Sequence, residues 1–243
     1  MIIGQKKIFA STLTYQLGRE VGIERAARAF QHQLDNPNRN SLPVVRVFAR
    51  LSHLGEVQVY HGSSTTLPKA RSRAAHEALK SEADFWLMCD DDVECDSSTL
   101  VRLLDLAGQE HAAVLPCLMR GAGSERETVN VQFDADAVLQ VHSTGAAFKA
   151  CRRGGTGMMV LSRAALALVT QRTREELGVW KDDDGQIKVP LFQLMLSEVN
   201  GDAWFGEDFS FCERLWGAGV ELRALLKGTS MHAGEVLNLE AIR

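Results

Sequence analysis

The sequence predicts an α/β protein with a central, mostly parallel sheet that is flanked by helices. In the first half of the 243-residue chain, apolar or alternating segments of strand length are separated by segments with helical spacing of apolar residues. Strands separated by helices of this length favour parallel pairing through right-handed crossovers. After residue 120 the segments become more mixed, which indicates a small extension of the same domain rather than an independent fold.

The first half contains four expected strands and three expected helices. The strands are at 7–12, 56–61, 84–92 and 112–116, and the helices are at 19–34, 68–79 and 97–106. Pro68 suits a first helical turn, and Ser97 or Ser98 serves as the cap of the third helix. The segment 35–40 is rich in Asn and Pro and is therefore expected to be a loop.

The second half begins with a loop at 121–127 that contains glycine and charged residues. The elements expected after it are strands at 129–133 and 137–141 that form a hairpin or two sheet edges, a glycine turn at 154–157, a strand at 158–161, helices at 162–172 and 207–216, and a strand at 220–226. We expect residues 1–243 to form one domain with two halves, 1–119 and 120–243.

The composition is that of an ordinary globular protein. A net charge of −4 gives no overall attraction to nucleic acid or to anionic membranes. The five cysteines form no Cys-x-x-Cys pair, which is typical of buried thiols in a reducing compartment. No apolar run approaches the ~20 residues that span a bilayer, and the N-terminus does not resemble a secretory signal. The expected location is the cytoplasm.

The most informative segment is 84–92, an apolar run that ends in three consecutive aspartates. Three carboxylates in a small volume need a compensating cation, and the carboxyl end of a strand is where open α/β sheets bind ligands. Because alternate residues point the same way, Asp90 and Asp92 face the site while Asp91 turns aside. Their hard oxygen atoms suit Mg²⁺ or Mn²⁺. The alternative is a solvated acidic turn.

This segment resembles the Asp-x-Asp motif of GT-A-fold glycosyltransferases, which binds a metal and a nucleotide sugar. Three further segments fall in the order of that family: 69–75 resembles one of its helix starts, 154–163 resembles its glycine loop and following strand, and 204–212 resembles the Glu-Asp helix start. The segment 231–234 carries a histidine where many members place a metal ligand. The resemblance covers about residues 7 to 235 and is best with compact bacterial or bacteriophage members.

The resemblance implies a GT-A-like, Rossmann-like fold and a metal-dependent transfer of a sugar from a UDP- or GDP-sugar to a hydroxyl acceptor. The half 1–119 would then bind the nucleotide sugar, and the half 120–243 the acceptor. The implied metal ligands are Asp90, Asp92 and His232, and the implied general base of an inverting reaction is Asp208, with Glu207 beside it. The implied contacts to the nucleotide sugar are Thr12, Tyr15, Arg71, Arg73, Asp90, Asp91, Gly155 and Thr156.

Each assignment has a structural alternative. Asp208 and Glu207 also suit the cap of a helix, His232 also suits the surface, and Arg71 and Arg73 also suit a solvated helix face. The alternatives for the function are a phage-type enzyme that glycosylates modified bases in DNA, and a non-catalytic module that binds sugar or nucleotide.

One feature departs from the pattern of this family, and another imitates its aspartate motif. The second strand ends in Tyr60 and His61, where many members have an acidic residue that reads the nucleotide. The segment 182–184 is a second aspartate triplet, but it precedes a glycine and follows no apolar strand, so we interpret it as a solvated turn.

Overall fold

The computed structural model describes residues 6–13, 43–62, 66–108, 110–120, 127–182, 185–196, 204–232 and 235–242. The helix expected at 19–34, the loop at 35–40 and Tyr15 lie outside these residues. No helix of the described segments is both long and apolar enough to cross a membrane.

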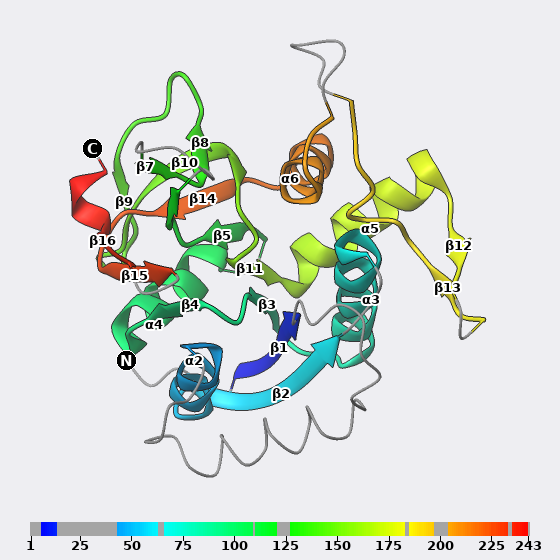
Figure 1. The fold of residues 1–243 in the computed structure, drawn as a ribbon, viewed down its shortest axis with the longest axis horizontal. Coiled ribbons are helices and arrows are strands. Elements are labelled where there is room, and N and C mark those ends of the chain that lie inside the picture. The colour runs from blue at the N-terminus through cyan, green and yellow to red at the C-terminus, as the bar shows by residue number, and fades with distance from the viewer. Residues whose placement is uncertain are drawn as a thin grey trace.

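A nine-stranded sheet forms the centre of the molecule (Figure 1). In spatial order its strands are β2 (Gly55–Gly62), β1 (Lys6–Leu13), β3 (Phe85–Cys89), β11 (Met158–Ser162), β5 (Ala112–Val114), β14 (Leu222–Leu225), β10 (Ala147–Gly154) and β8 (Val131–Phe133), with β9 (Gln140–Val141) paired to β10. Strands β2, β1 and β3 are parallel neighbours, as are β5 and β14, whereas β11 and β10 run opposite to the rest. The α/β fold with a mostly parallel sheet is therefore confirmed, with two reversed strands.

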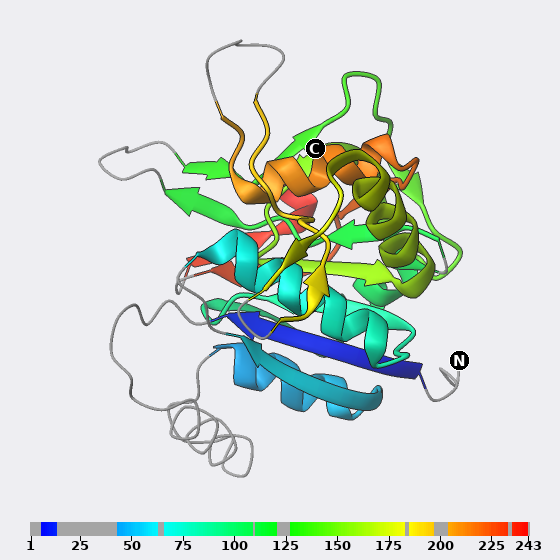
Figure 2. The same ribbon diagram turned by 90° about the vertical axis from the view of Figure 1, so that its right-hand side faces the viewer.

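Helices cover both faces of this sheet. Their bounds are α2 (Pro43–Ser52), α3 (Leu67–Lys80), α4 (Ser97–Ala107), α5 (Arg163–Leu177) and α6 (Glu207–Gly217), and a 3₁₀ helix, η1 (Leu239–Ala241), lies near the C-terminus. The apolar faces of α2 and α4 belong to one core, and those of α3, α5 and α6 belong to the core on the other side. Figure 2 shows α2 and α3 on opposite sides of β1.

Strand β3 explains why an unbroken apolar run is needed at the centre of the sheet. Phe85 and Leu87 pack into the core beneath α2 and α4, while Trp86 and Met88 pack into the core beneath α3, α5 and α6. All of its residues are buried, so neither face tolerates a polar side chain. The run ends where the sheet ends, and the next residue is Asp90.

Small sheets flank the central one. The first joins β4 (Val93–Cys95), β15 (Thr229–His232) and β16 (Glu235–Asn238), and the others pair β6 (Leu118–Arg120) with β7 (Glu127–Val129) and β12 (Trp180–Lys181) with β13 (Ile187–Lys188). The first of these brings the C-terminal part of the chain beside the segment that follows Asp92.

One expectation about local structure was wrong, and two elements were not foreseen. Of the two arrangements expected for the segments 129–133 and 137–141, the structure has the two sheet edges and not the hairpin, because β8 and β9 each pair with β10. Helix α4 is capped by Asp96, whose carboxylate accepts a hydrogen bond from the Thr99 amide at 2.8 Å, rather than by Ser97 or Ser98. Strand β10 and helix α2 were not expected at all.

Candidate active site

Asp90 lies at the junction of β3 and the glycine turn that precedes β11. Its amide donates a hydrogen bond to the Gly157 carbonyl at 2.7 Å, which ties the two segments together. A side chain on Gly157 would approach the Asp90 carboxylate to 3.3 Å, so this glycine leaves room for the aspartate. The strand end and the turn together hold the Asp90 carboxylate in place.

A single buried arginine joins acidic residues that the sequence places on two distant elements. Arg71 lies on α3 and is 4% exposed. Its Nη2 is 3.3 Å from Asp90 Oδ1, and its Nη1 is 3.0 Å from Glu207 Oε1 and also contacts Asp208 Oδ1. The predicted metal ligand Asp90, after β3, and the predicted base Asp208, on α6, therefore share one cation.

The charges in this cluster are not balanced. Burial by itself lowers the pKa of Arg71, but the carboxylates of Asp208, Asp90 and Glu207 outweigh it and raise that pKa above its ordinary value. Burial raises the pKa of the Asp90 carboxyl, and the nearby Asp208 and Asp92 raise it further against the opposing effect of Arg71. The site thus holds more negative charge than its own cation neutralises.

Asp208 stands in the first turn of α6, where the helix dipole favours a carboxylate. Its Oδ1 accepts a hydrogen bond from Thr156 Oγ1 at 2.5 Å and also contacts Arg71. Among the residues that the structure describes, both contacts of this carboxylate are made by Oδ1, which leaves Oδ2 without a hydrogen-bond partner. Thr156 itself is fully buried in the turn before β11, so it fixes the orientation of the carboxylate.

Asp92 lies beside His232 of β15. Strand β15 pairs with β4 so that His232 lies opposite Val93, and His232 Nε2 is 3.4 Å from Asp92 Oδ2. The other ring nitrogen, Nδ1, is 3.0 Å from the Leu118 carbonyl and must donate to it, because a carbonyl only accepts. A neutral ring then presents a lone pair to a carboxylate, an arrangement that suits a shared cation, whereas a protonated ring forms a simple ion pair.

Thr12 lies near the end of β1, one residue after Ser11, which is in register with Met88 of β3. The Thr12 hydroxyl is buried and has no hydrogen-bond partner within the described part of the chain. A buried hydroxyl without a partner is unusual in a folded protein. Its place at the carboxyl end of the sheet fits the predicted contact with a nucleotide sugar, which stays a prediction.

Gly155 has a packing role. A side chain at this position would meet the Asn130 amide at 2.6 Å, and the Gly155 amide donates to the Asn130 carbonyl at 2.8 Å. A side chain at this position would therefore displace the Asn130 side chain, whose Oδ1 accepts a hydrogen bond from the Cys117 amide at 2.8 Å. The contact between Gly155 and the nucleotide sugar stays a prediction, and the packing role of Gly155 does not depend on it.

Arg73 belongs to a different ion-pair cluster from Arg71, and the backbone of Asp91 contacts α2. Arg73 is two residues further along α3 and faces Asp182, with Nε 3.4 Å from Asp182 Oδ2. Asp182 is buried and also lies 3.8 Å from Lys188, so the interpretation of this segment as a solvated turn is wrong at Asp182. The backbone carbonyl of Asp91 accepts a 3.5 Å hydrogen bond from the Val44 amide at the start of α2.

The predicted metal ligands do not form a closed set. Within the described residues, no group of three or more His, Cys, Asp or Glu side chains is arranged to hold a metal ion. Asp90 pairs with Arg71, while Asp92 contacts His232. The donor chemistry nevertheless fits a hard divalent cation, because carboxylate oxygens and one imidazole nitrogen surround a region with excess negative charge.

Sequence reasoning did not foresee the link from Arg71 and Thr156 to Asp208. The sequence contains a partial signal, since Arg71 and Arg73 are two positions apart on a helix and must face different sides. It contains no signal for the side on which the carboxylates of α6 lie.

No known protein-family model matches this chain, and no curated protein matches its sequence. Among solved structures, the chain is similar to A197 from STIV, at 12% identity over 96% of this chain and 93% of that chain, with a TM-score of 0.49. It is also similar to the mannose-1-phosphate geranyltransferase from Thermus thermophilus, at 11% identity over 91% of this chain and 74% of that chain, with a TM-score of 0.39.

A third similar structure is the 4-diphosphocytidyl-2C-methyl-D-erythritolsynthase from Anaerococcus prevotii. It is 11% identical, with 98% of this chain and 92% of that chain covered and a TM-score of 0.38. Because all three TM-scores are below 0.5, these likenesses carry no conclusion about the function of this chain.

Proposed function

We propose that this chain is a metal-dependent glycosyltransferase that moves a sugar from a UDP- or GDP-sugar to a hydroxyl acceptor, with inversion of the anomeric centre. The observation that carries the proposal is the meeting of Asp90, from the end of β3, with Glu207 and Asp208, from the start of α6, at the buried Arg71. The carboxylate proposed for the donor side and the carboxylate proposed for the acceptor side would then belong to one site.

Asp90, Asp92 and His232 would hold the cation, Mn²⁺ or Mg²⁺. A bound divalent cation would neutralise the charge that develops on the departing diphosphate. The protein's own contribution is an excess of carboxylates over the single guanidinium of Arg71, which favours the uptake of a cation.

Asp208 would act as the general base through Oδ2, while Thr156 and Arg71 hold Oδ1. The acceptor hydroxyl gives its proton to Oδ2, and its oxygen forms the new bond to the anomeric carbon. The bond from that carbon to the diphosphate oxygen breaks on the opposite side, and the nucleoside diphosphate leaves with the electron pair. Attack from the side opposite the leaving group inverts the configuration.

The first test is a screen of nucleotide sugars for slow hydrolysis in the presence of Mn²⁺, because hydrolysis requires no knowledge of the acceptor. We expect one donor class to be hydrolysed, and we expect calorimetry with UDP and GDP to give far weaker binding when a chelator is added. Asp92→Ala should abolish the metal-dependent part of nucleotide binding. The matched control Asp136→Ala, at an exposed position on the loop after β8, should leave it unchanged.

Equal nucleotide affinity with and without chelator would show that nucleotide binding does not depend on a metal ion. Metal-dependent binding without any hydrolysis would instead identify a non-catalytic module. Transfer of the sugar to a modified base in DNA would identify the acceptor as nucleic acid while leaving the chemistry at Asp208 unchanged.

A further inference from the structure

A hollow of about 460 Å³ lies between α5 and the C-terminal half of α6, outside the cluster around Arg71. Residues of β10 and of the segment before α6 complete its walls. Its volume falls within the range of sites for small organic ligands, roughly 300–1,000 Å³. Nothing in the chemistry of Asp90 and Asp208 uses it.

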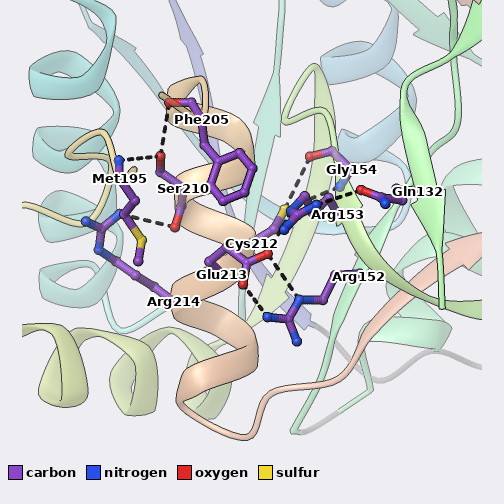
Figure 3. A network of polar contacts seen from close by, with 10 residues as sticks. All are labelled: Gln132, Arg152, Arg153, Gly154, Met195, Phe205, Ser210, Cys212, Glu213 and Arg214. Carbon is purple, nitrogen blue, oxygen red and sulfur yellow. Dashed lines mark hydrogen bonds and ion pairs between the residues drawn. The ribbon is translucent and has the colours of Figure 1, made fainter. Parts of the chain in front are cut away.

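The wall of this hollow contains a tryptophan that is exposed and held in place. The Trp216 side chain at the end of α6 is 61% exposed, and the Arg152 guanidinium lies over its ring at 3.6 Å from the centroid. Arg152 is in turn fixed by Glu213, with Nε 3.1 Å from Oε1, and Arg153 binds the same carboxylate at 2.7 Å (Figure 3). An aromatic ring fixed in this way offers an apolar surface at little cost in ordering.

The floor of the hollow is also held rigidly. Arg214 is 5% exposed and donates hydrogen bonds to the carbonyls of Leu191 and Ser210 at 3.2 and 3.1 Å. The Ser210 hydroxyl accepts a 3.0 Å hydrogen bond from the Met195 amide, so the segment before α6 is fastened to the helix (Figure 3). The site is therefore formed before any ligand arrives.

The charges of the walls cancel. Three arginines and three glutamates line the hollow, and Arg172 pairs with Glu175 at 3.1 Å as Arg152 pairs with Glu213. Such walls do not attract a phosphate chain or a cation by net charge. They offer many hydrogen-bond donors and acceptors beside one aromatic ring, which is the combination that suits a ligand with hydroxyls on its edge and C–H groups on its face.

The position along α6 connects this hollow with the proposed acceptor side. Asp208 and Trp216 are eight residues apart on one helix, which corresponds to about 12 Å at 1.5 Å per residue. We infer that the hollow binds an uncharged oligosaccharide, as the part of the acceptor that is remote from the reacting hydroxyl. This inference rests on the proposed function, and it selects a glycan rather than DNA as the acceptor.

The test measures the binding of neutral oligosaccharides of two to six hexose units to the full chain, without donor or metal. The same titration with a DNA duplex and with an acidic oligosaccharide provides the competing ligands. We expect at least one neutral oligosaccharide to bind, and we expect Trp216→Ala to weaken that binding by about 10-fold or more. Ile187→Ala, at an exposed position on β13 that does not line the hollow, is the matched control and should bind as the unmodified chain does.

A second variant tests whether the oligosaccharide binds at the hollow or at the N-terminal end of α6. Trp204 is 62% exposed and precedes the helix, so it matches Trp216 in type and exposure. Loss of oligosaccharide binding in Trp204→Ala with full binding in Trp216→Ala would overturn the inference. The absence of any neutral ligand, or a preference for DNA or for the acidic oligosaccharide, would overturn it as well.

Donor hydrolysis is measured on the same variants so that the two proposals fail separately. Oligosaccharide binding that depends on Trp216, in a chain that hydrolyses no nucleotide sugar, would sustain this site and reject the glycosyltransferase. Donor hydrolysis without oligosaccharide binding would sustain the glycosyltransferase and reject this site.

Discussion

Two arginines on α3 belong to ionic clusters of opposite character. Arg71 faces the carboxylates of Asp90, Glu207 and Asp208, which no second cation balances among the ion pairs of the described residues. Arg73 faces Asp182, whose carboxylate also lies 3.8 Å from the buried Lys188. Among the ion pairs of the described residues, this helix therefore carries a cluster in which carboxylates outnumber the cation on one side, and a cluster in which cations outnumber the carboxylates on the other.

The second cluster has the features of a structural tie. Lys188 also contacts Glu77 of α3 at 3.2 Å, as does Lys80 at the same distance, so the strand β13 is attached to the helix by alternating charges. The side chain of Asp182 is 1% exposed and that of Lys188 is 4% exposed. Both Asp90 and Asp182 begin a run of three aspartates, and the balance of charge around each run is what distinguishes them.

The largest expected effect is on catalysis at the cluster around Arg71. Asp208→Asn keeps the size and the hydrogen-bonding oxygen of the side chain but removes the proton acceptor, so turnover should fall by about 10²–10⁴-fold with donor binding nearly unchanged. Steady-state rates of donor hydrolysis or transfer measure it. Asp136→Asn, at an exposed position, is the control. A near-normal rate, or a product that keeps the anomeric configuration of the donor, would exclude Asp208 as the base.

The next effect is on stability at the cluster around Arg73 and Asp182. Asp182→Asn leaves Arg73 and the buried Lys188 without this carboxylate, and breaking a buried ion pair on one side costs about 3–5 kcal/mol. Urea denaturation should give a lower unfolding free energy, with the change near the lower limit because Lys188 keeps Glu77. A change below about 1 kcal/mol would show that the tie contributes little.

A smaller effect is expected for the histidine beside Asp92. His232→Ala should weaken Mn²⁺ affinity by about 10-fold, the loss typical of removing a ligand or its support. Calorimetric titration with Mn²⁺ measures it, and His53→Ala, at an exposed position after α2, should leave the affinity unchanged. Equal affinities in the two variants would return His232 to the role of a surface residue.

The smallest effect is on the pH dependence of stability at Asp90. The pKa of this carboxyl is raised in the folded chain, so the folded state binds a proton more tightly than the unfolded state and loses stability as the pH rises through that range. Asp90→Asn should therefore raise the unfolding free energy of the metal-free chain at pH 7, and the difference should vanish in acid. Denaturation at several pH values tests the sign. A loss of stability at pH 7, as in Asp182→Asn, would mean that the two clusters are alike.

Local patterns predicted most of the central sheet. The segment 84–92 was recognisable because β3 is buried on both faces and its apolar run must be continuous. Helix α2 carries a signal of another kind, helical spacing of apolar residues, which our prediction omitted. The buried side chains among its described positions include Val44, Val47, Phe48 and Leu51. Strand β10 has no such signal, because its burial pattern does not alternate and charged residues interrupt it.

The sequence by itself determined where strands and helices alternate, and that a carboxylate triplet follows the central strand. It also determined that Arg71 and Arg73 face different sides of α3, because one turn of an α-helix takes 3.6 residues and two positions therefore span more than half a turn. Only the tertiary structure decided which arginine meets which aspartates. Arg71 and Asp208 are 137 positions apart, and no local pattern specifies a partner at that separation. The same holds for Asp182, whose sequence reads as a solvated turn and whose cations come from α3 and β13. Charge balance is a property of the assembled site, because it depends on residues that the chain brings together only when it folds.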